Sequence, residues 1–274
     1  MAESALKIIT GPDEIWAQLR SEVRLQLDNE PALEKFLGPT VLEHGRFQDA
    51  LSAILALRMK NDVLDRSTIR QYIVDSHLGD PTIVDAAKWD LHAFCQRDPA
   101  CNRYSIPFLY YKGYQGLQLY RTGHWLWNNG HTELALYLQS RVSEVFDMDI
   151  HPAARIGKGI LIDHATSIVI GETAVVGDNV SMLHEVTLGG TGKDSGDRHP
   201  KVHSGVLIGA GAKILGNVRV GTNSKIGAGS VVLDDVADYC TVAGIPAVPV
   251  GDCSGGTPAL DMDHYLETDA EQEA

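Results

Sequence analysis

The chain has 274 residues, of which 44% are hydrophobic, and a formal net charge of -13 at pH 7, as expected for a globular protein of one or two domains. The negative charge argues against sequence-independent binding to nucleic acid or to anionic membranes, because both require clustered Lys and Arg. No apolar run approaches the roughly 20 residues that span a bilayer, and the start MAESALKIIT lacks the features of a secretory signal. We therefore expect a cytoplasmic protein.

Residues 1–142 are predicted to form an α-helical domain. Apolar residues recur at helical spacing in residues 14–27, 47–59 and 133–145. Prolines near the element starts favour several short helices over one long rod. Residues 107–127 are rich in aromatic side chains, and packing in a core or a subunit contact explains them better than stacking on a ligand.

The cysteines of the chain indicate neither a zinc site nor a disulfide framework. They do not form a CxxC motif, and they lack the Cys/His spacing of metal ligands. We expect reduced thiols and no bound metal. The four residues are Cys95, Cys101, Cys240 and Cys253.

The segment 143–251 carries an aliphatic or alanine residue at every sixth position in two runs. A period of six fits a solenoid whose coil has three short flat faces, with each of these residues pointing inward. We therefore predict a repeat domain over 143–251. The first run is Ile150, Ile156, Ile162, Ile168, Ala174, Val180 and Val186, and the second is Val202, Ile208, Ile214, Val220, Ile226 and Val232.

Between the two runs the sequence leaves the repeat. Val186 and Val202 are sixteen residues apart, which is not a multiple of six, so residues 189–201 are predicted to form an extruded loop. The loop reads GGTGKDSGDRHPK; ordered loops on rigid repeats often carry function, and a solvated excursion is the alternative. Residues 252–274 are acidic and predicted to be a flexible tail.

Histidines are more numerous in the repeat than packing requires, although any one of them could be structural. Asp163 and His164 directly follow the inward Ile162 and should lie on the outer surface. Asp149 precedes His164 by fifteen residues, slightly less than one eighteen-residue coil, so the two could meet on adjacent turns. A carboxylate that binds one ring nitrogen of an imidazole raises the basicity of the other, as a general base needs. The histidines in or beside the repeat are His151, His164, His184, His199 and His203.

Two pairs of residues that each contain an arginine suggest a substrate that carries both a negative and a positive charge. Arg198 and His199 lie in the loop, and Arg97 and Asp98 precede the aromatic segment. Arg can hold a carboxylate through a bidentate pair and Asp can hold an ammonium group, so together they could bind a zwitterionic amino acid. Singly, each is as well explained by a surface salt bridge.

Several segments resemble the serine acetyltransferases. These are DIHPAARIGKGILIDHAT, VTLGGTGKDSGDRHPK and VLIGAGAKILGN in the repeat, and RDPACNRYSIPFLYYKGYQGLQLYRTGHWLWNNG in the helical half. The likeness covers most of residues 85–250. It implies an α+β fold in which an N-terminal α-helical domain precedes a left-handed parallel β-helix. It also implies a homotrimer with active sites between neighbouring subunits, or a dimer of trimers.

The resemblance implies transfer of an acetyl group from acetyl-CoA to the hydroxyl of L-serine, giving O-acetyl-L-serine and CoA as the first step of cysteine biosynthesis. His164 matches the general base and Asp149 the residue that orients it. His199 matches a further catalytic residue that reaches across the subunit boundary. The resemblance also implies direct transfer, so we expect neither an acetyl-enzyme nor a requirement for metal.

The same matching implies the binding residues. Asp98 and Asp163 resemble the partners of the substrate ammonium, and Arg198 with His199 resembles the carboxylate contacts. L-Cysteine, which carries the same two groups, is expected to bind there and inhibit. The pantetheine arm of acetyl-CoA would lie along the coil edge, where the turn chemistry of the hexads is an alternative reason for small residues. The matching cofactor positions are Gly190, Ala210, Gly211 and Ala228.

Some positions depart from the family pattern. The chain ends in Ala274 where many members end in isoleucine, which argues against a complex with O-acetylserine sulfhydrylase. Val248 stands where a basic residue is usual, and Ser167 stands where glycine is usual. Three other interpretations stay open: a zinc-dependent carbonic anhydrase on a similar coil, a noncatalytic scaffold, and an acyltransferase for homoserine, a sugar amine or another small acceptor.

Overall fold

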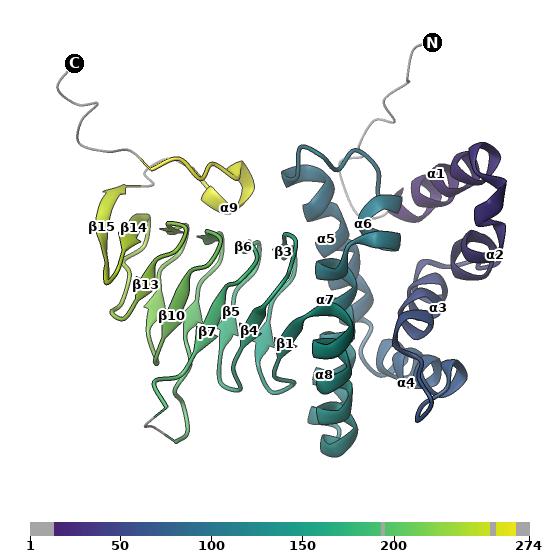
Figure 1. Ribbon diagram of the computed structural model, residues 1–274, viewed down its shortest axis with the longest axis horizontal. Coiled ribbons are helices and arrows are strands. Elements are labelled where there is room, and N and C mark those ends of the chain that lie inside the picture. Colours follow the sequence, from purple (N-terminus) through teal and green to yellow (C-terminus); the bar gives the residue numbers. More distant parts are fainter. Residues whose placement is uncertain (1–13, 193–194, 253–255, 267–274) are drawn as a thin grey trace, which may run out of the picture. The chain divides into compact units, whose positions relative to one another are not determined.

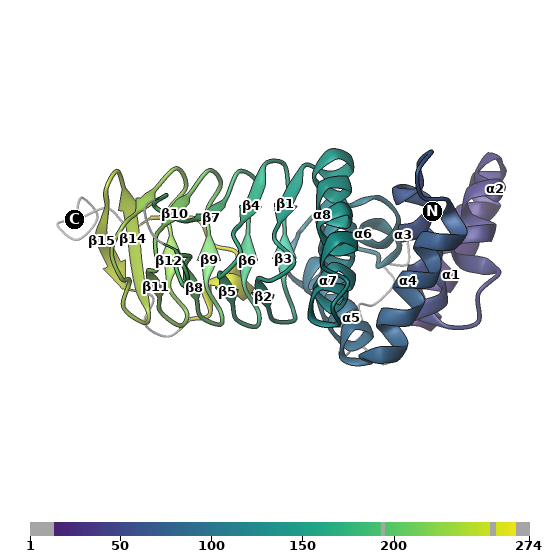
Figure 2. The ribbon, with the colours of Figure 1, turned by 90° about the horizontal axis from the view of Figure 1, so that it is seen from below.

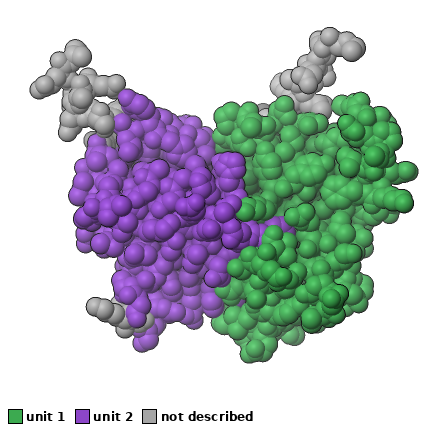
Figure 3. Space-filling model, in the orientation of Figure 1, with its two compact units in different colours: residues 1–145 green, residues 146–274 purple. Residues whose placement is uncertain are grey.

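The computed structural model describes residues 14–192, 195–252 and 256–266 (Figure 1). The chain divides into two compact units, Met1–Val145 and Phe146–Ala274 (Figure 3). The first is helical and the second is built of short strands. The helical elements are α1 (Ile15–Asn29), η2 (Pro31–Leu33), α2 (Glu34–Leu37), η3 (Gly38–Leu42), α3 (Phe47–Met59), α4 (Arg66–Gly79), α5 (Thr82–Arg97), α6 (Ser105–Tyr110), α7 (Lys112–Asn128) and α8 (Thr132–Phe146).

The predicted helices are confirmed, and buried polar contacts join some of them. Helix α3 has the predicted bounds, and most of its side chains are buried. Helices α5 and α7 are joined by an ion pair in which Arg121 donates to Asp90 Oδ2 at 2.7 Å, and Gln118 donates to the same oxygen at 3.0 Å. Because all three side chains are buried, this cluster fixes α5 against α7. Within the described residues, no helix is both long and apolar enough to cross a membrane.

The second unit is a parallel β-helix with three sheets, as Figure 2 shows in three rows of strands. Sheet A contains β1 (Met148–Ile150), β4 (Ile168–Ile170), β7 (Thr187–Gly189), β10 (Lys213–Leu215) and β13 (Val231–Val232). Sheet B contains β2 (Arg155–Ile156), β5 (Val175–Val176), β8 (Lys201–Val202) and β11 (Arg219–Val220). Sheet C contains β3 (Leu161–Ile162), β6 (Ser181–Met182), β9 (Leu207–Ile208), β12 (Lys225–Ile226), β14 (Cys240–Gly244) and β15 (Ala247–Asp252). The predicted fold class is confirmed.

The second hexad run is confirmed residue by residue, because its six members are buried and each lies in the strand of its face. Six residues of the first run are buried and Ile156 is half-buried, but the uniform period of this run is wrong. Met148 pairs with Ile168, twenty residues on, whereas Val169 pairs with Thr187, eighteen residues on. Two extra residues therefore lie in the corner 163–167, which joins β3 to β4. Downstream of this corner the inward strand positions are Ile170, Val176, Met182 and Leu188.

The extra length of this corner is absorbed by left-handed backbone. His164, Ala165 and Ser167 have φ of 56°, 57° and 57°, a region that non-glycine residues rarely occupy. The corner 163–167 consequently bulges from the coil. The larger interruption is the loop after β7, which ends at β8; Val176 pairs with Val202 across it, so the coil resumes in register.

The described end of the chain folds back on the coil. Strands β14 and β15 form an antiparallel hairpin that closes sheet C. Helix α9 (Pro258–Asp261) then returns along the outside of this sheet (Figure 1), where Ser181 Oγ donates to the Ala259 carbonyl at 2.7 Å. Residues 256–266 thus pack on the coil, unlike the flexible tail that was expected; 253–255 and 267–274 lie outside the described residues.

Candidate active site

The corner 163–167 presents His164 to solvent. The His164 side chain is 74% exposed, and its Nε2 lies 3.6 Å from Asp163 Oδ2. The ring of His184 meets the ring of His164 edge to face, with 5.9 Å between the centroids. The predicted outward position of Asp163 and His164 therefore agrees with the structure. An exposed imidazole with a carboxylate at its edge can accept a proton from a bound hydroxyl.

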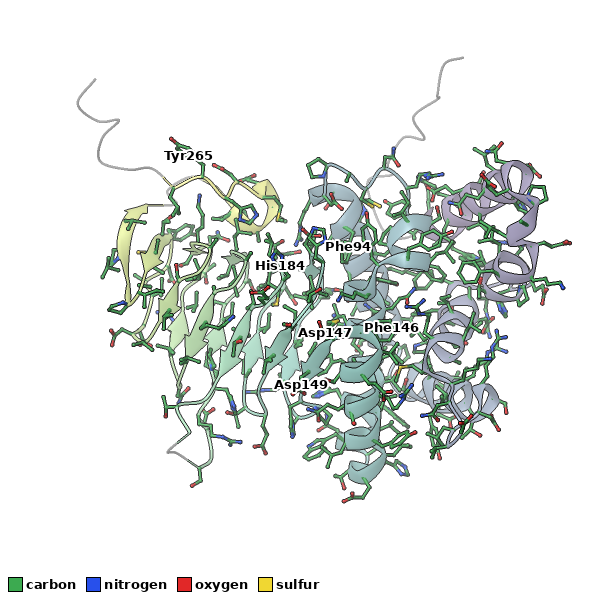
Figure 4. All side chains as sticks on the ribbon, in the orientation of Figure 1. Phe94, Phe146, Asp147, Asp149, His184 and Tyr265 are labelled. Carbon is green, nitrogen blue, oxygen red and sulfur yellow. The ribbon has the colours of Figure 1, made fainter. Side chains whose placement is uncertain are left out.

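Asp149 lies elsewhere in the same coil. It is the exposed middle residue of β1 on sheet A, where it pairs with Val169. Among the described residues of one chain, the carboxylate within ion-pair distance of His164 is Asp163. Figure 4 shows Asp149 apart from His184, the ring neighbour of His164, along the strand direction. Within one chain, Asp149 lies on a flat face and His164 on a corner, and the first coil has twenty residues where eighteen were expected, so a pairing of Asp149 with His164 stays a prediction.

His184 is a further candidate site residue, which the sequence pattern indicated only as one of several histidines of the repeat. It follows β6 as His164 follows β3, because Ile162 pairs with Met182. Within the described residues its Nδ1 is buried without a hydrogen-bond partner. A buried unpartnered N–H is costly, so the tautomer that carries its proton on Nε2 is favoured. The signal in the sequence was the twenty-residue separation of two histidines that occupy equivalent positions.

The predicted cofactor residues Ala210, Gly211 and Ala228 lie on the same row of corners as His164. Ala210 and Gly211 follow β9, and Ala228 follows β12. Gly211 N–H donates to the His184 carbonyl at 3.0 Å, so the corners stack directly. Coils are about 4.8 Å apart, which places Ala210 roughly 10 Å along the coil axis from His164. Small residues leave this edge open to an extended ligand.

Arg198 and His199 occupy a different row of corners, the one that follows sheet A. Arg198 donates to Glu172 Oε2 at 2.7 Å, and this bond lowers the pKa of the Glu172 carboxyl. Arg198 also donates to the Gly196 carbonyl at 3.0 Å. The predicted cofactor residue Gly190 lies here, next to Arg198, and not beside Ala210. Arg198 is thus held in place by the loop and by the preceding coil.

His199 is 7% exposed and packs on Gly171. The Thr173 backbone N–H donates to His199 Nδ1 at 3.1 Å, which makes Nδ1 an acceptor and places the proton of the neutral ring on Nε2. Burial, and then the charge of Arg198, lower the pKa of His199. The ring is therefore a neutral donor through Nε2–H, suited to an anionic oxygen.

Asp98 belongs to the helical unit, where it follows the last residue of α5. Its Oδ1 accepts a hydrogen bond from the Ala100 N–H at 2.8 Å, so a tight turn fixes the carboxylate. The predicted site residues are therefore distributed over two rows of coil corners and the helical unit. Over the described ranges, no group of three or more His, Cys, Asp or Glu side chains is arranged to hold a metal ion.

The parallel coil with histidines on an edge of small residues defines a class, the hexapeptide-repeat acyltransferases. Residues 199–234 match the family described as bacterial transferase hexapeptide (six repeats). Residues 15–119 match the family described as serine acetyltransferase, N-terminal. The match of the helical unit therefore identifies a narrower family than the hexapeptide-repeat acyltransferases as a whole.

Relatives of known name agree over nearly the whole chain. The chain is 51% identical to the serine acetyltransferase of Salmonella typhimurium over 252 residues, which are 92% of each protein. It is 50% identical to that of Haemophilus influenzae over 253 residues, 92% of this chain and 95% of the relative. The chain belongs to the serine acetyltransferase family and is an acetyl-CoA-dependent acyltransferase.

Solved structures agree as well. A serine acetyltransferase in complex with cysteine has a TM-score of 0.92 at 49% identity, covering 94% of this chain and 100% of that one. The Brucella abortus enzyme in complex with coenzyme A has a TM-score of 0.87 at 49% identity, covering 88% and 96%. The Neisseria gonorrhoeae enzyme in complex with serine has a TM-score of 0.84 at 47% identity, covering 86% and 97%.

Proposed function

We propose that this enzyme transfers the acetyl group of acetyl-CoA to the hydroxyl of L-serine, giving O-acetyl-L-serine and CoA as the first step of cysteine biosynthesis. The observation that carries the proposal is the position of His164 at one end of a row of corners that continues through Ala210, Gly211 and Ala228. This row can take an extended thioester, with its reactive end at the imidazole. The relatives bound to coenzyme A and to serine support both substrates.

His164 acts as the general base. It accepts the serine hydroxyl proton while the hydroxyl oxygen attacks the thioester carbonyl. The tetrahedral intermediate collapses by breaking the carbon–sulfur bond, and the imidazolium returns the proton to the CoA thiolate. No residue becomes acetylated. The exposure of His164 supports this role, because the side chain is open to both substrates.

His184 stabilises the oxygen of the tetrahedral intermediate. Its ring contacts that of His164, so a group that reacts at His164 lies within its reach. With the proton on Nε2, the ring donates a hydrogen bond to the developing oxyanion, where such bonds are worth about 2.7–4 kcal/mol.

The site is completed between chains. His164 and the Arg198–His199 pair lie on corners that sheet A separates, so one chain alone does not hold them together. In a homotrimer, or a dimer of trimers, the Arg198–His199 corner of one subunit would meet the His164 corner of the next. Asp149 of one subunit orients His164 of the neighbouring subunit across the same contact, because Asp149 lies on the outer face of sheet A in its own chain.

The serine zwitterion is held by opposite charges. Asp98 and Asp163 bind its ammonium group, while Arg198 and the Nε2–H of His199 bind its carboxylate. Arg198 keeps one side of its guanidinium on Glu172, which orients the other N–H groups. L-Cysteine carries the same two groups and inhibits by occupying this site; the relative bound to cysteine supports this.

The reduced thiols Cys95, Cys101 and Cys240 are consistent with a cytoplasmic location, which we also propose.

Loss of thioester absorbance from acetyl-CoA, measured with L-serine, with L-homoserine and with no acceptor, tests the proposal. Serine-dependent loss that L-cysteine suppresses is the expected result. Loss with homoserine instead would change the acceptor and keep the mechanism. No loss with any acceptor, together with zinc in the purified protein, would favour a metal-dependent activity and overturn the proposal.

Intersubunit assembly has its own test. His164→Ala is expected to be nearly inactive and Asp149→Asn to lose less activity, and a mixture refolded or co-expressed should exceed the activity of either variant because some interfaces then carry neither substitution. Mixing that restores nothing, while mixed oligomers are shown to form, would place Asp149 and His164 of one chain in the same site.

A further inference from the structure

Two buried cysteines of the helical unit lie in contact. Cys95 Sγ and Cys101 Sγ are 3.3 Å apart, and the residues are 5% and 3% exposed. Cys95 is in α5, and Cys101 lies in the turn that follows this helix. Both are free thiols. The catalytic mechanism uses neither, so the pairing has another explanation.

The turn between these cysteines carries Asp98, and its hydrogen bonds fix that residue. The Asp98 N–H donates to the Phe94 carbonyl at 2.9 Å, and the Cys101 N–H donates to the Asp98 carbonyl at 2.9 Å. The Ala100 N–H holds the Asp98 carboxylate. Because the backbone N–H of Cys101 is hydrogen-bonded to the carbonyl of Asp98, a displacement of Cys101 displaces Asp98.

We propose that Cys95 and Cys101 form a reversible disulfide that switches off serine binding by moving Asp98. The switch rests on the proposed role of Asp98 in holding the serine ammonium group. A disulfide requires an S–S distance of about 2.05 Å, so the sulfurs must approach by about 1.2 Å. Movement of this size at a substrate-positioning residue costs about 100-fold in activity.

The turn moves more easily than the helix. Cys95 is surrounded in α5 by the buried residues Leu91, His92 and Phe94, which pack in the core of the unit. Cys101 lies between Ala100 and Asn102, which are both exposed. Closure of the bond is therefore accommodated by the segment 98–101, which is the segment that carries the Asp98 carboxylate.

A hydroperoxide is the oxidant that the pair would take. The hydrogen bond to Cys101 and burial raise the pKa of the Cys95 thiol. Cys101 attacks first, because it lies in the segment between the exposed residues Ala100 and Asn102, where local opening admits the oxidant, whereas Cys95 is held in the core by α5. The Cys101 sulfur displaces one peroxide oxygen, which breaks the O–O bond and gives a sulfenic acid with water or an alcohol. Cys95 then attacks the Cys101 sulfur and expels water. Two thiols lose two protons and two electrons, which the peroxide takes up; a dithiol reductant reverses the change by exchange.

The test uses the full chain in a Cys240→Ser, Cys253→Ser background, so that the two candidate thiols are the ones present. The protein is treated with hydrogen peroxide and then with a dithiol. Intact mass and a peptide map report the bond, and thioester absorbance reports kcat and KM for serine. We expect a mass loss of two hydrogens, a Cys95–Cys101 cross-linked peptide and a 10- to 100-fold lower kcat/KM for serine, all reversed by the dithiol.

A matched variant separates the bond from general oxidative damage. Cys101→Ser in the same background should keep the serine kinetics of the reduced protein and lose the reversible peroxide response. Circular dichroism and oligomer size confirm that it folds; if Cys101→Ser fails to fold, Cys101→Ala or Cys95→Ser replaces it.

The outcomes distinguish the switch from the proposed function. Reduced protein without serine-dependent activity would refute the function, whatever the mass shows. Active protein that gives no Cys95–Cys101 bond on peroxide treatment, or forms the bond with unchanged serine kinetics, would overturn the switch alone.

Discussion

Substitution of Gly171 by alanine tests whether the position of His199 matters for serine. A methyl group at Gly171 would lie 2.1 Å from both Nε2 and Cδ2 of the His199 ring. Carbon contacts need about 3.5 Å, so the ring must move by about 1.4 Å. The Thr173 N–H would then lose its bond to Nδ1, which is 3.1 Å long in the structure. The small residue at 171 is therefore required by the histidine.

The expected loss follows from this displacement. A shift of about 1 Å in a substrate-positioning group costs about 100-fold, so Gly171→Ala should lower kcat/KM for serine by 10- to 100-fold, mainly through KM. Overpacking should also lower the free energy of unfolding by about 1–3 kcal/mol. Steady-state kinetics and urea denaturation measure the two effects.

A double-mutant cycle makes the explanation specific. In a His199→Ala background the clash is removed, so Gly171→Ala should cost little further activity or stability. Gly45→Ala is the matched control, because a Cβ there meets no described atom within 4 Å. Wild-type serine kinetics for Gly171→Ala, or equal losses in both backgrounds, would refute the proposed contact between His199 and serine.

Four further outcomes are expected. His164→Ala should remove most turnover and leave circular dichroism unchanged; near-native rates would exclude it as the base. His184→Phe should lower kcat about 100-fold with little change in KM for serine, and a pure KM effect would count against oxyanion stabilisation. Burial lowers the pKa of His77 from 6.5 to about 4, so as pH falls the unfolded chain binds a proton at this residue before the folded chain does. The free energy of unfolding should therefore fall by up to about 3 kcal/mol between pH 6.5 and pH 4. Urea denaturation at several pH values should show that the free energy of unfolding of His77→Gln depends less on pH. Arg121→Met should lower stability by about 3–5 kcal/mol because the buried Asp90 carboxylate would lose the Arg121 guanidinium while keeping the Gln118 hydrogen bond, and a loss below about 1 kcal/mol would show that the ion pair contributes little.

The parts of the fold that the sequence predicts are those set by local periodicity. Helix α3 has the predicted bounds, and the run from Val202 to Val232 has the predicted inward positions, because each pattern repeats without interruption. The first coil is different. Ile162 and Ile168 are six residues apart and both buried, yet the corner between them contains two extra residues. Side-chain type does not distinguish a buried strand residue from a buried corner residue.

The candidate site also contains some features that the sequence predicts and others that it does not. The exposed position of His164 could be predicted, because it lies two residues after the inward Ile162. The relation of Asp149 to His164 could not, because sequence separation locates residues along the coil and not around it. The pairing of Arg198 with Glu172 depends on how a long loop folds back, and the loop sequence has no periodicity from which to predict that contact.

The hairpin of β14 and β15 determines how the strand stack ends. A parallel sheet that stopped at β14 would leave the N–H and C=O groups of a straight edge open, and such an edge recruits strands from other molecules. Strand β15 instead runs antiparallel, and it contains Pro249, which has no N–H to donate. Sheet C therefore ends in an antiparallel strand with a proline, and not in an open parallel edge, which removes one template on which strands of other molecules could add to the coil.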